Sequence, residues 1–158
     1  MILFALACAT APPPAAADTL DQGRWHSEAA DLSLDFGPGW VLVMEPQSFR
    51  SELPATRLEA AQGELKVALT FSAVPPMAMQ GASALDLLTE LSPALGAAKT
   101  PDYRLERLPH CTGPAGQDTA LRQIEGHTWI ARRTDTGLAI LHAWDADPAP
   151  AIQLMCGG

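Results

Sequence analysis

Apolar and polar residues alternate along much of the chain, and this alternation predicts an antiparallel β-sheet. The clearest segment runs from Glu64 to Phe71, where every second residue is a large apolar one. Because successive side chains of a strand point to opposite faces, this pattern is typical of a half-buried strand. Further strands are predicted at residues 32–36, 40–44, 56–61, 103–108, 119–125, 127–134, 138–144 and 151–156. No element is predicted in the polar lead 19–30.

Turn residues separate the predicted strands. Gly37-Pro38-Gly39 interrupts the first pair, since a sharp reversal needs a permissive backbone. Gln62-Gly63 and Asp135-Thr136-Gly137 are typical hairpin connections, because their glycines can adopt a positive φ. Neighbouring strands in the chain are therefore expected to pair directly.

One amphipathic helix is predicted over residues 83–95. Ser83 and Asp86 fit a capping box, in which a hydroxyl and a carboxylate satisfy free N–H groups. Leucines recur at helical spacing, at positions 85, 88, 91 and 95, and are expected to pack on the sheet. Pro93 is expected to kink or end the helix. The predicted fold class is α+β, with a single antiparallel sheet of about six to eight strands and one main helix.

The N-terminal residues have the order of an export signal. An apolar run, Ile2 to Ala7, leads to Cys8, and an Ala/Thr/Pro tether follows up to residue 17. Ala5-Leu6-Ala7-Cys8 resembles a bacterial lipobox, in which the cysteine becomes the acylated N-terminus. We therefore expect a signal peptide, lipobox and tether at 1–17 and one domain at 18–158.

Two alternatives stay open for this segment. Ala15-Ala16-Ala17 before Asp18 is a small-x-small cleavage site of ordinary secretion. A cytosolic chain with a frayed N-terminus is the other, since no Lys or Arg precedes the apolar run. The main expectation is a bacterial envelope lipoprotein, periplasmic or in the outer membrane, and a secreted protein is the alternative.

Composition and charge exclude one class of function. The chain is 47% hydrophobic and 18% charged, which is typical of a globular domain, and its net charge is -8. Its ten Lys and Arg residues are scattered, apart from the pair Arg132-Arg133. That pair is expected at a solvated edge, because neighbours on a strand point to opposite faces. Nucleic-acid binding needs a basic stripe to displace phosphate counterions, so we exclude it.

The later cysteines predict a disulfide. With Cys8 removed or acylated, Cys111 and Cys156 remain, and in an oxidising compartment they are expected to bond. The bond would link a Pro/Gly loop to the end of the last predicted strand. It would enclose about 45 residues and stabilise the fold by something on the order of 4 kcal/mol. The alternative is a reactive thiol at Cys111, with His110 as its base.

Histidines on the last hairpin are the candidate metal ligands. With a two-residue turn, Trp129 faces His142 and His127 faces Trp144. The simpler interpretation is an aromatic–imidazole cluster on the sheet. The sharper one is a small metal or ligand site that uses His127, His142 and Asp145. None of the established zinc spacings occurs in the chain.

Catalytic and cofactor motifs are missing from the sequence. It contains no Gly-x-Ser-x-Gly elbow, Gly-rich phosphate loop or dinucleotide fingerprint. We therefore predict a protein that is not an enzyme and uses no cofactor.

The opening of the domain resembles a known group of exported proteins. Phe36-Gly37-Pro38-Gly39-Trp40 lies between two predicted strands, and hairpin, helix and a closing meander follow. This Pro38-Gly39-Trp40 opening and the order of elements resemble the PsbP-like and DcrB-like proteins. The resemblance implies an antiparallel sheet covered by helices, and a non-catalytic accessory or binding role at a membrane surface.

These observations predict an exported, lipid-anchored envelope protein with a non-catalytic accessory or binding role. Its expected partners are the membrane, through the anchor, and another envelope protein; the oligomeric state stays open. One alternative is a small metal- or ligand-binding periplasmic domain that uses His127 and His142. The other is an inhibitor or immunity-like protein that blocks another exported protein through its acidic surface.

Overall fold

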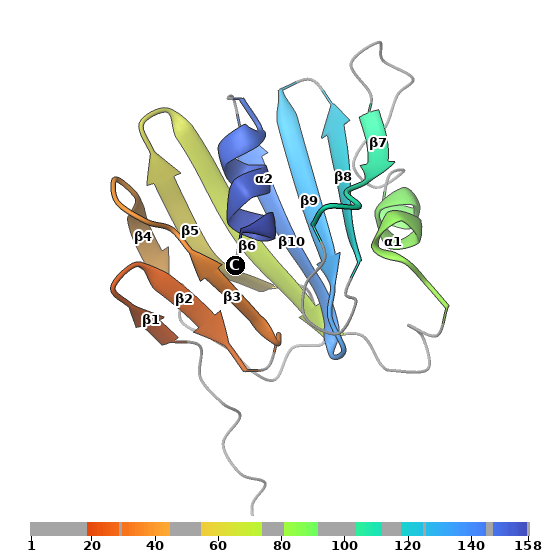
Figure 1. Cartoon of the computed structure of the whole chain (residues 1–158), viewed down its shortest axis with the longest axis horizontal. Helices are drawn as coiled ribbons and strands as arrows, with labels where there is room; N and C mark the ends of the chain where they lie inside the picture. The colour runs from red at the N-terminus through yellow and green to blue at the C-terminus, as the bar shows by residue number, and fades with distance from the viewer. Residues whose placement is uncertain are drawn as a thin grey trace, which may run out of the picture.

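The computed structural model describes residues 19–28, 30–44, 55–73, 81–91, 104–111, 118–124, 126–144 and 147–157. These residues form two antiparallel sheets and two helices (Figure 1). The small sheet contains β1 (Thr19–Asp21), β2 (Arg24–Ser27) and β3 (Leu32–Asp35). The large sheet contains β4 (Val41–Met44), β5 (Ala55–Gln62), β6 (Leu65–Ala73), β7 (Arg104–Arg107), β8 (Thr119–Ile124), β9 (His127–Arg133) and β10 (Gly137–Trp144). The helices are α1 (Ala84–Leu91) and α2 (Ala149–Cys156).

The large sheet joins two meanders at its centre. Its strand order is β4-β5-β6-β10-β9-β8-β7, so β6 pairs with β10, the last of the described strands. The register places Leu69 opposite Leu141, and both side chains are buried. The α+β class and the predominantly antiparallel sheet are therefore as predicted.

The main core lies between the large sheet, the small sheet and α2. Figure 1 shows the small sheet and α2 over the same side of the large sheet. Trp25 and Leu34 of the small sheet are fully buried there, against apolar residues of β5, β6, β9 and β10. The apolar alternation in β6 is explained by this packing, since Leu65, Val67 and Leu69 all face this core.

Helix α1 covers part of the opposite side of the sheet, over β7, β8 and β9. Its buried Ala84 and Leu88 pack on a second, smaller core. The predicted capping box is present: the Asp86 N–H donates to the Ser83 Oγ at 3.2 Å, and the Ser83 N–H donates to the Asp86 carboxylate at 2.8 Å. The Ser83 hydrogen bonds lower the pKa of Asp86. The predicted helix end at residues 92–95 lies outside the described residues.

A second helix corrects one prediction: residues 151–156 were expected to form a strand, but they belong to α2. Ala151, Leu154 and Met155 are buried at helical spacing. A short apolar run fits a buried strand and a buried helix equally well, so its periodicity does not discriminate. Pro148 and Pro150 lie at the start of α2, where a missing N–H breaks no helical hydrogen bond.

The polar lead is also structured, which corrects the expectation of a single sheet. β1 and β2 lie within residues 19–30 and form the small sheet with β3. Only two residues of β2, Trp25 and Ser27, are buried. Two buried positions among polar residues make too short an alternation to be recognised as a strand.

Cys111 and Cys156 form the predicted disulfide, with an S–S distance of 2.02 Å. Because Cys156 is the last residue of α2, the bond ties the end of a helix, rather than of a strand, to the chain segment after β7. Near this bond, Arg132 is only 3% exposed. The prediction that Arg132-Arg133 lies at a solvated edge is therefore wrong for Arg132.

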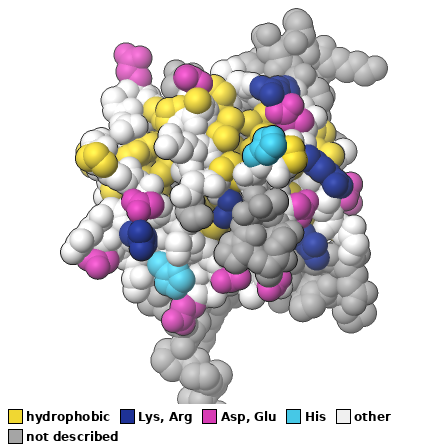
Figure 2. Space-filling model, in the orientation of Figure 1, with side chains coloured by type: hydrophobic (Ala, Val, Ile, Leu, Met, Phe, Trp, Pro, Cys, Tyr) yellow, Lys and Arg dark blue, Asp and Glu magenta, His cyan; other side chains and the backbone are white. Residues whose placement is uncertain are grey.

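The charged surface agrees with the scattered basic residues of the sequence. On the face that carries the small sheet and α2, Lys and Arg side chains stand apart from one another among Asp and Glu side chains (Figure 2). Among the described residues, neither helix is long and apolar enough to cross a membrane. Residues 1–17, with the predicted lipobox and Cys8, lie outside the described part of the chain.

Candidate binding site on the open sheet face

The second side of the large sheet is covered unevenly. Helix α1 packs over β7, β8 and β9, whereas β4 presents exposed valines on this side. Val41 is 70% exposed and Val43 is 56% exposed. The cross-strand register places Val41, Ala61, Lys66 and Trp144 in one row, so their side chains share this side. We call the surface formed by Val41, Val43, Glu59, Ala61, Lys66 and Trp144 the open face.

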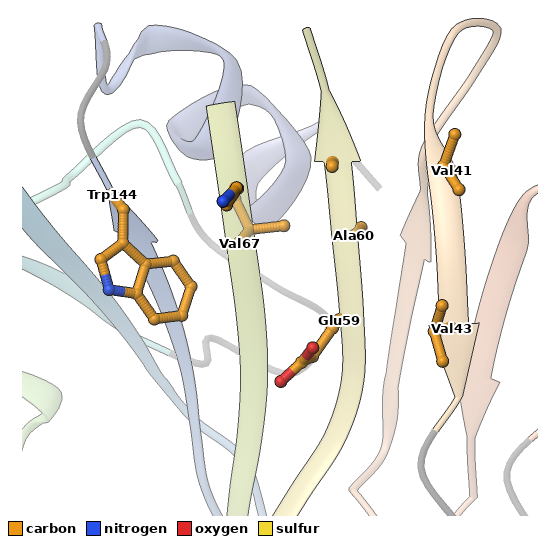
Figure 3. Close-up of a pocket in the computed structure, with 8 residues that line it drawn as sticks. Val41, Val43, Glu59, Ala60, Val67 and Trp144 are labelled. Atoms are coloured by element: carbon orange, nitrogen blue, oxygen red, sulfur yellow. The ribbon is translucent and has the colours of Figure 1, made fainter. Parts of the chain in front are cut away.

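A shallow pocket of about 440 Å³ lies on the open face. Its lining comes from four neighbouring strands and comprises Val41, Val43, Glu59, Ala60, Ala61, Lys66, Val67 and Trp144. Figure 3 shows the Trp144 ring and the Glu59 carboxylate on either side of β6, and the two valines along β4. The pocket therefore combines an aromatic wall, an apolar edge and charged groups.

Aromatic rings from β9 and β10 continue this surface away from the pocket. His142 stacks on Trp129, with ring centroids 4.6 Å apart and planes 7° apart, and its ring lies 4.1 Å from that of Trp144. The Arg122 guanidinium lies over Trp129 at 5.0 Å. The predicted facing pairs are confirmed, since Trp129 is opposite His142 and His127 is opposite Trp144.

Two histidines in this stack share a hydrogen bond. His127 Nδ1 lies 3.1 Å from His142 Nε2, so one nitrogen donates and the other accepts. Burial, together with the neighbouring His127, lowers the pKa of His142 from its ordinary value of 6.5 to about 4. At neutral pH the His142 ring is therefore uncharged, which suits a hydrogen bond between two imidazoles.

Of the three metal ligands predicted from the sequence, the described residues bring together only two, the histidine nitrogens. His127 and His142 are brought together, but Asp145 lies outside the described part of the chain. Within that part, no group of three His, Cys, Asp or Glu side chains is arranged to hold a metal ion. The pair is accounted for by its hydrogen bond and ring stacking.

Charge on the open face is unpaired within the described part of the chain. Glu59 and Lys66 both line the pocket, and neither side chain takes part in the ion pairs or side-chain hydrogen bonds found among the described residues. None of the lining residues is Ser, Thr or Cys, so the pocket lining offers no hydroxyl or thiol nucleophile. Its groups can bind a partner by packing, stacking and charge.

Sequence reasoning missed five members of this surface: Val41, Val43, Glu59, Ala61 and Lys66. The continuous apolar run at 40–44 was expected to form a strand, but β4 is an edge strand with one side open. The available signal was the alternation in β6, which places Lys66 opposite the core-facing residues. The position of α1 decides which part of that side stays uncovered. The apolar–polar alternation of the strands does not predict where α1 packs.

Neither a protein-family model nor a curated protein sequence matches this chain. The resemblance to the PsbP-like and DcrB-like proteins therefore stays a prediction.

Proposed function

We propose that this protein is an exported, non-catalytic binding protein of the bacterial cell envelope, anchored through an acylated Cys8. Its domain recognises another envelope protein through the open face. The partner presents an apolar surface, with a basic side chain placed to meet Glu59 and an acidic one to meet Lys66.

The disulfide supports the export part of the proposal. Disulfides form and persist in oxidising compartments and are rare in the reducing cytosol. Cys111 and Cys156 are 45 residues apart in the sequence, and their sulfur atoms lie at bonding distance. Together with the apolar run that leads to Cys8, this pairing favours a protein that works outside the cytoplasm.

The exposure of the β4 valines is the single observation that carries the binding role. Val41 and Val43 are the most exposed large apolar side chains among the described residues. They line the same pocket as Trp144, and tryptophan is enriched in the buried centres of protein interfaces. This apolar patch is flanked by charges that have no partner among the described residues. Such a surface is typical of an interaction site, because a partner gains free energy by covering the apolar patch and pairing the charges.

Site-specific photo-crosslinking in cells tests the binding role. A crosslinking amino acid replaces Val43 in one variant and Leu20 in a control, since Leu20 is 37% exposed on the small sheet. We expect a discrete protein adduct at position 43 and none at position 20. Adding the exposed-charge reversal Lys66→Glu should weaken the adduct several-fold. Equal adducts at both positions, or no adduct at 43, would contradict the proposal.

Fractionation tests the anchor separately. The wild-type chain should partition with membranes and carry the mass of acyl chains on Cys8. The Cys8→Ser variant should be released in soluble form. A variant that stays in the membrane fraction, or a wild-type mass without acyl chains, would show that the anchor is wrong.

The proximity of two imidazoles favours one second candidate, a metal-binding role. Nitrogens 3.1 Å apart can in principle share one ion, with other ligands completing the site. Zinc titration followed by calorimetry distinguishes the candidates. Stoichiometric uptake that disappears in the His127→Ala/His142→Ala double variant would support the metal role, and no uptake would refute it.

A further inference from the structure

A buried cation lies against the disulfide. Arg132 is 3% exposed, and its Nη2 lies 3.6 Å from the Cys111 sulfur. The guanidinium also donates to the Thr119 hydroxyl at 3.4 Å and to the Met155 carbonyl of α2. The ion pairs among the described residues, Arg24–Asp35 and Arg104–Glu106, do not include it. Among the described residues, its charge is therefore met by a hydroxyl, a helix carbonyl and a sulfur rather than by a carboxylate.

This cation stabilises a thiolate at Cys111 more than one at Cys156. Arginine is rarely fully buried unless it is paired with an anion, so a negative charge beside Arg132 is favoured. Reduction of the bond creates that charge if Cys111 becomes the thiolate, because a neighbouring cation lowers the pKa of a thiol. Cys156 is the last residue of α2, where the negative end of the helix dipole opposes a second thiolate.

The two cysteines also differ in their exposure to solvent. Cys111 is buried, whereas Cys156 is only partly buried at the end of α2. Cys156 is therefore the cysteine that an external thiol reaches more easily, and its sulfur is the poorer leaving group. Cys111, whose sulfur is the better leaving group, lies beside Arg132. Thiol–disulfide exchange is fastest when the leaving thiol has a low pKa.

We propose that Cys156 is a thiol-exchange site for low-molecular-weight thiols, with Arg132 as the residue that stabilises the leaving group. The incoming thiolate attacks the Cys156 sulfur and forms a mixed disulfide with it. The Cys111–Cys156 bond breaks, and its electron pair stays on Cys111, which leaves as a thiolate beside Arg132. No oxidant is consumed, and the incoming thiol is the reductant. The step releases the end of α2 from the segment after β7.

The position of the adduct in the otherwise native protein tests this directly. The full chain carrying Cys8→Ser, in its oxidised form, is exposed to reduced glutathione and then quenched with acid. After alkylation of the free thiol, peptide mass spectrometry locates the glutathione. We expect it at least about tenfold more often on Cys156 than on Cys111. An even distribution of glutathione between the two cysteines, or a preference for Cys111, would overturn the proposal. This test needs no substitution of Arg132.

The rate of reduction tests the role of Arg132. We expect Arg132→Met to lower the rate of reduction by glutathione about tenfold, and Arg132→Lys to retain most of it. Arg133→Met is the matched control, because it removes the neighbouring arginine, whose side chain points to the other side of β9. Loss of packing would expose the bond and speed its reduction, so a slower rate cannot come from a damaged fold. If folded Arg132→Met is reduced as fast as the wild type, Arg132 does not stabilise the leaving group.

Discussion

The hydrogen-bonded histidines make the stability of the fold depend on pH in a predictable direction. The folded-state pKa of His142 is about 4, and its ordinary value of 6.5 represents the unfolded chain. The unfolded state therefore takes up a proton more readily than the folded state. The contribution of neutral His142 is fully present above pH 6.5 and is lost as the pH falls from 6.5 towards 4.

The size of this effect follows from the same two pKa values. A tenfold change in a proton-binding constant is worth about 1.4 kcal/mol, so His142 should cost the fold about 2.5 kcal/mol between pH 7.5 and pH 4.5. Solvent reaches part of the ring and screens its charge, which makes this an upper value.

His142→Phe is the informative change, because it keeps a ring against Trp129 and Trp144 but removes the titrating group. Urea unfolding is followed by tryptophan fluorescence at both pH values, for the wild type and the variant. Every other side chain is the same in both proteins, so the difference between their losses reports the contribution of His142. The variant should lose up to about 2.5 kcal/mol less than the wild type.

The same measurement on His26→Gln controls for the removal of a histidine away from the stack. Equal losses in the wild type and in His142→Phe, within about 0.5 kcal/mol, would refute the pKa and the buried environment from which it follows.

Three further changes test the packing, the cap and the disulfide by denaturant unfolding. Leu34→Ala removes a fully buried side chain and should cost about 2–5 kcal/mol, whereas Leu20→Ala, at a 37% exposed position, should cost under about 0.5 kcal/mol. Ser83→Ala should cost about 1 kcal/mol, because the Asp86 N–H loses its acceptor, and an unchanged midpoint would show that the cap contributes nothing. Replacing Cys111 and Cys156 together by alanine should cost about 4 kcal/mol, and a loss below about 1 kcal/mol would contradict the loop-closure estimate.

Local signals predicted the elements whose neighbours in sequence are also neighbours in space. The pairing of His127 with Trp144 followed from the length of the turn between β9 and β10, and the start of α1 followed from Ser83 and Asp86. These features depend on a few adjacent residues, so the sequence contained enough information to place them.

Features that depend on distant packing could not be predicted in this way. The run 151–156 becomes a helix because it packs on β3, β9 and β10, and nothing within the run requires this. Arg132 is buried because α2 and Cys111 cover it, although its immediate neighbours suggested a solvated edge. The open face was missed for the same reason, since it is defined by the part of the sheet that α1 leaves uncovered.

The central β6–β10 pair also constrains the order in which the protein can be assembled. The edge meander of β4, β5 and β6 ends at residue 73, and its partner β10 begins at residue 137. The β4–β6 part of the large sheet must therefore wait for β10 before its inner border is paired, and such non-local pairing slows folding. A nascent chain emerging from N- to C-terminus keeps this sheet incomplete until β10 has been made. An incompletely folded chain can still pass through a narrow channel. The delay therefore keeps the chain in that state for most of its synthesis.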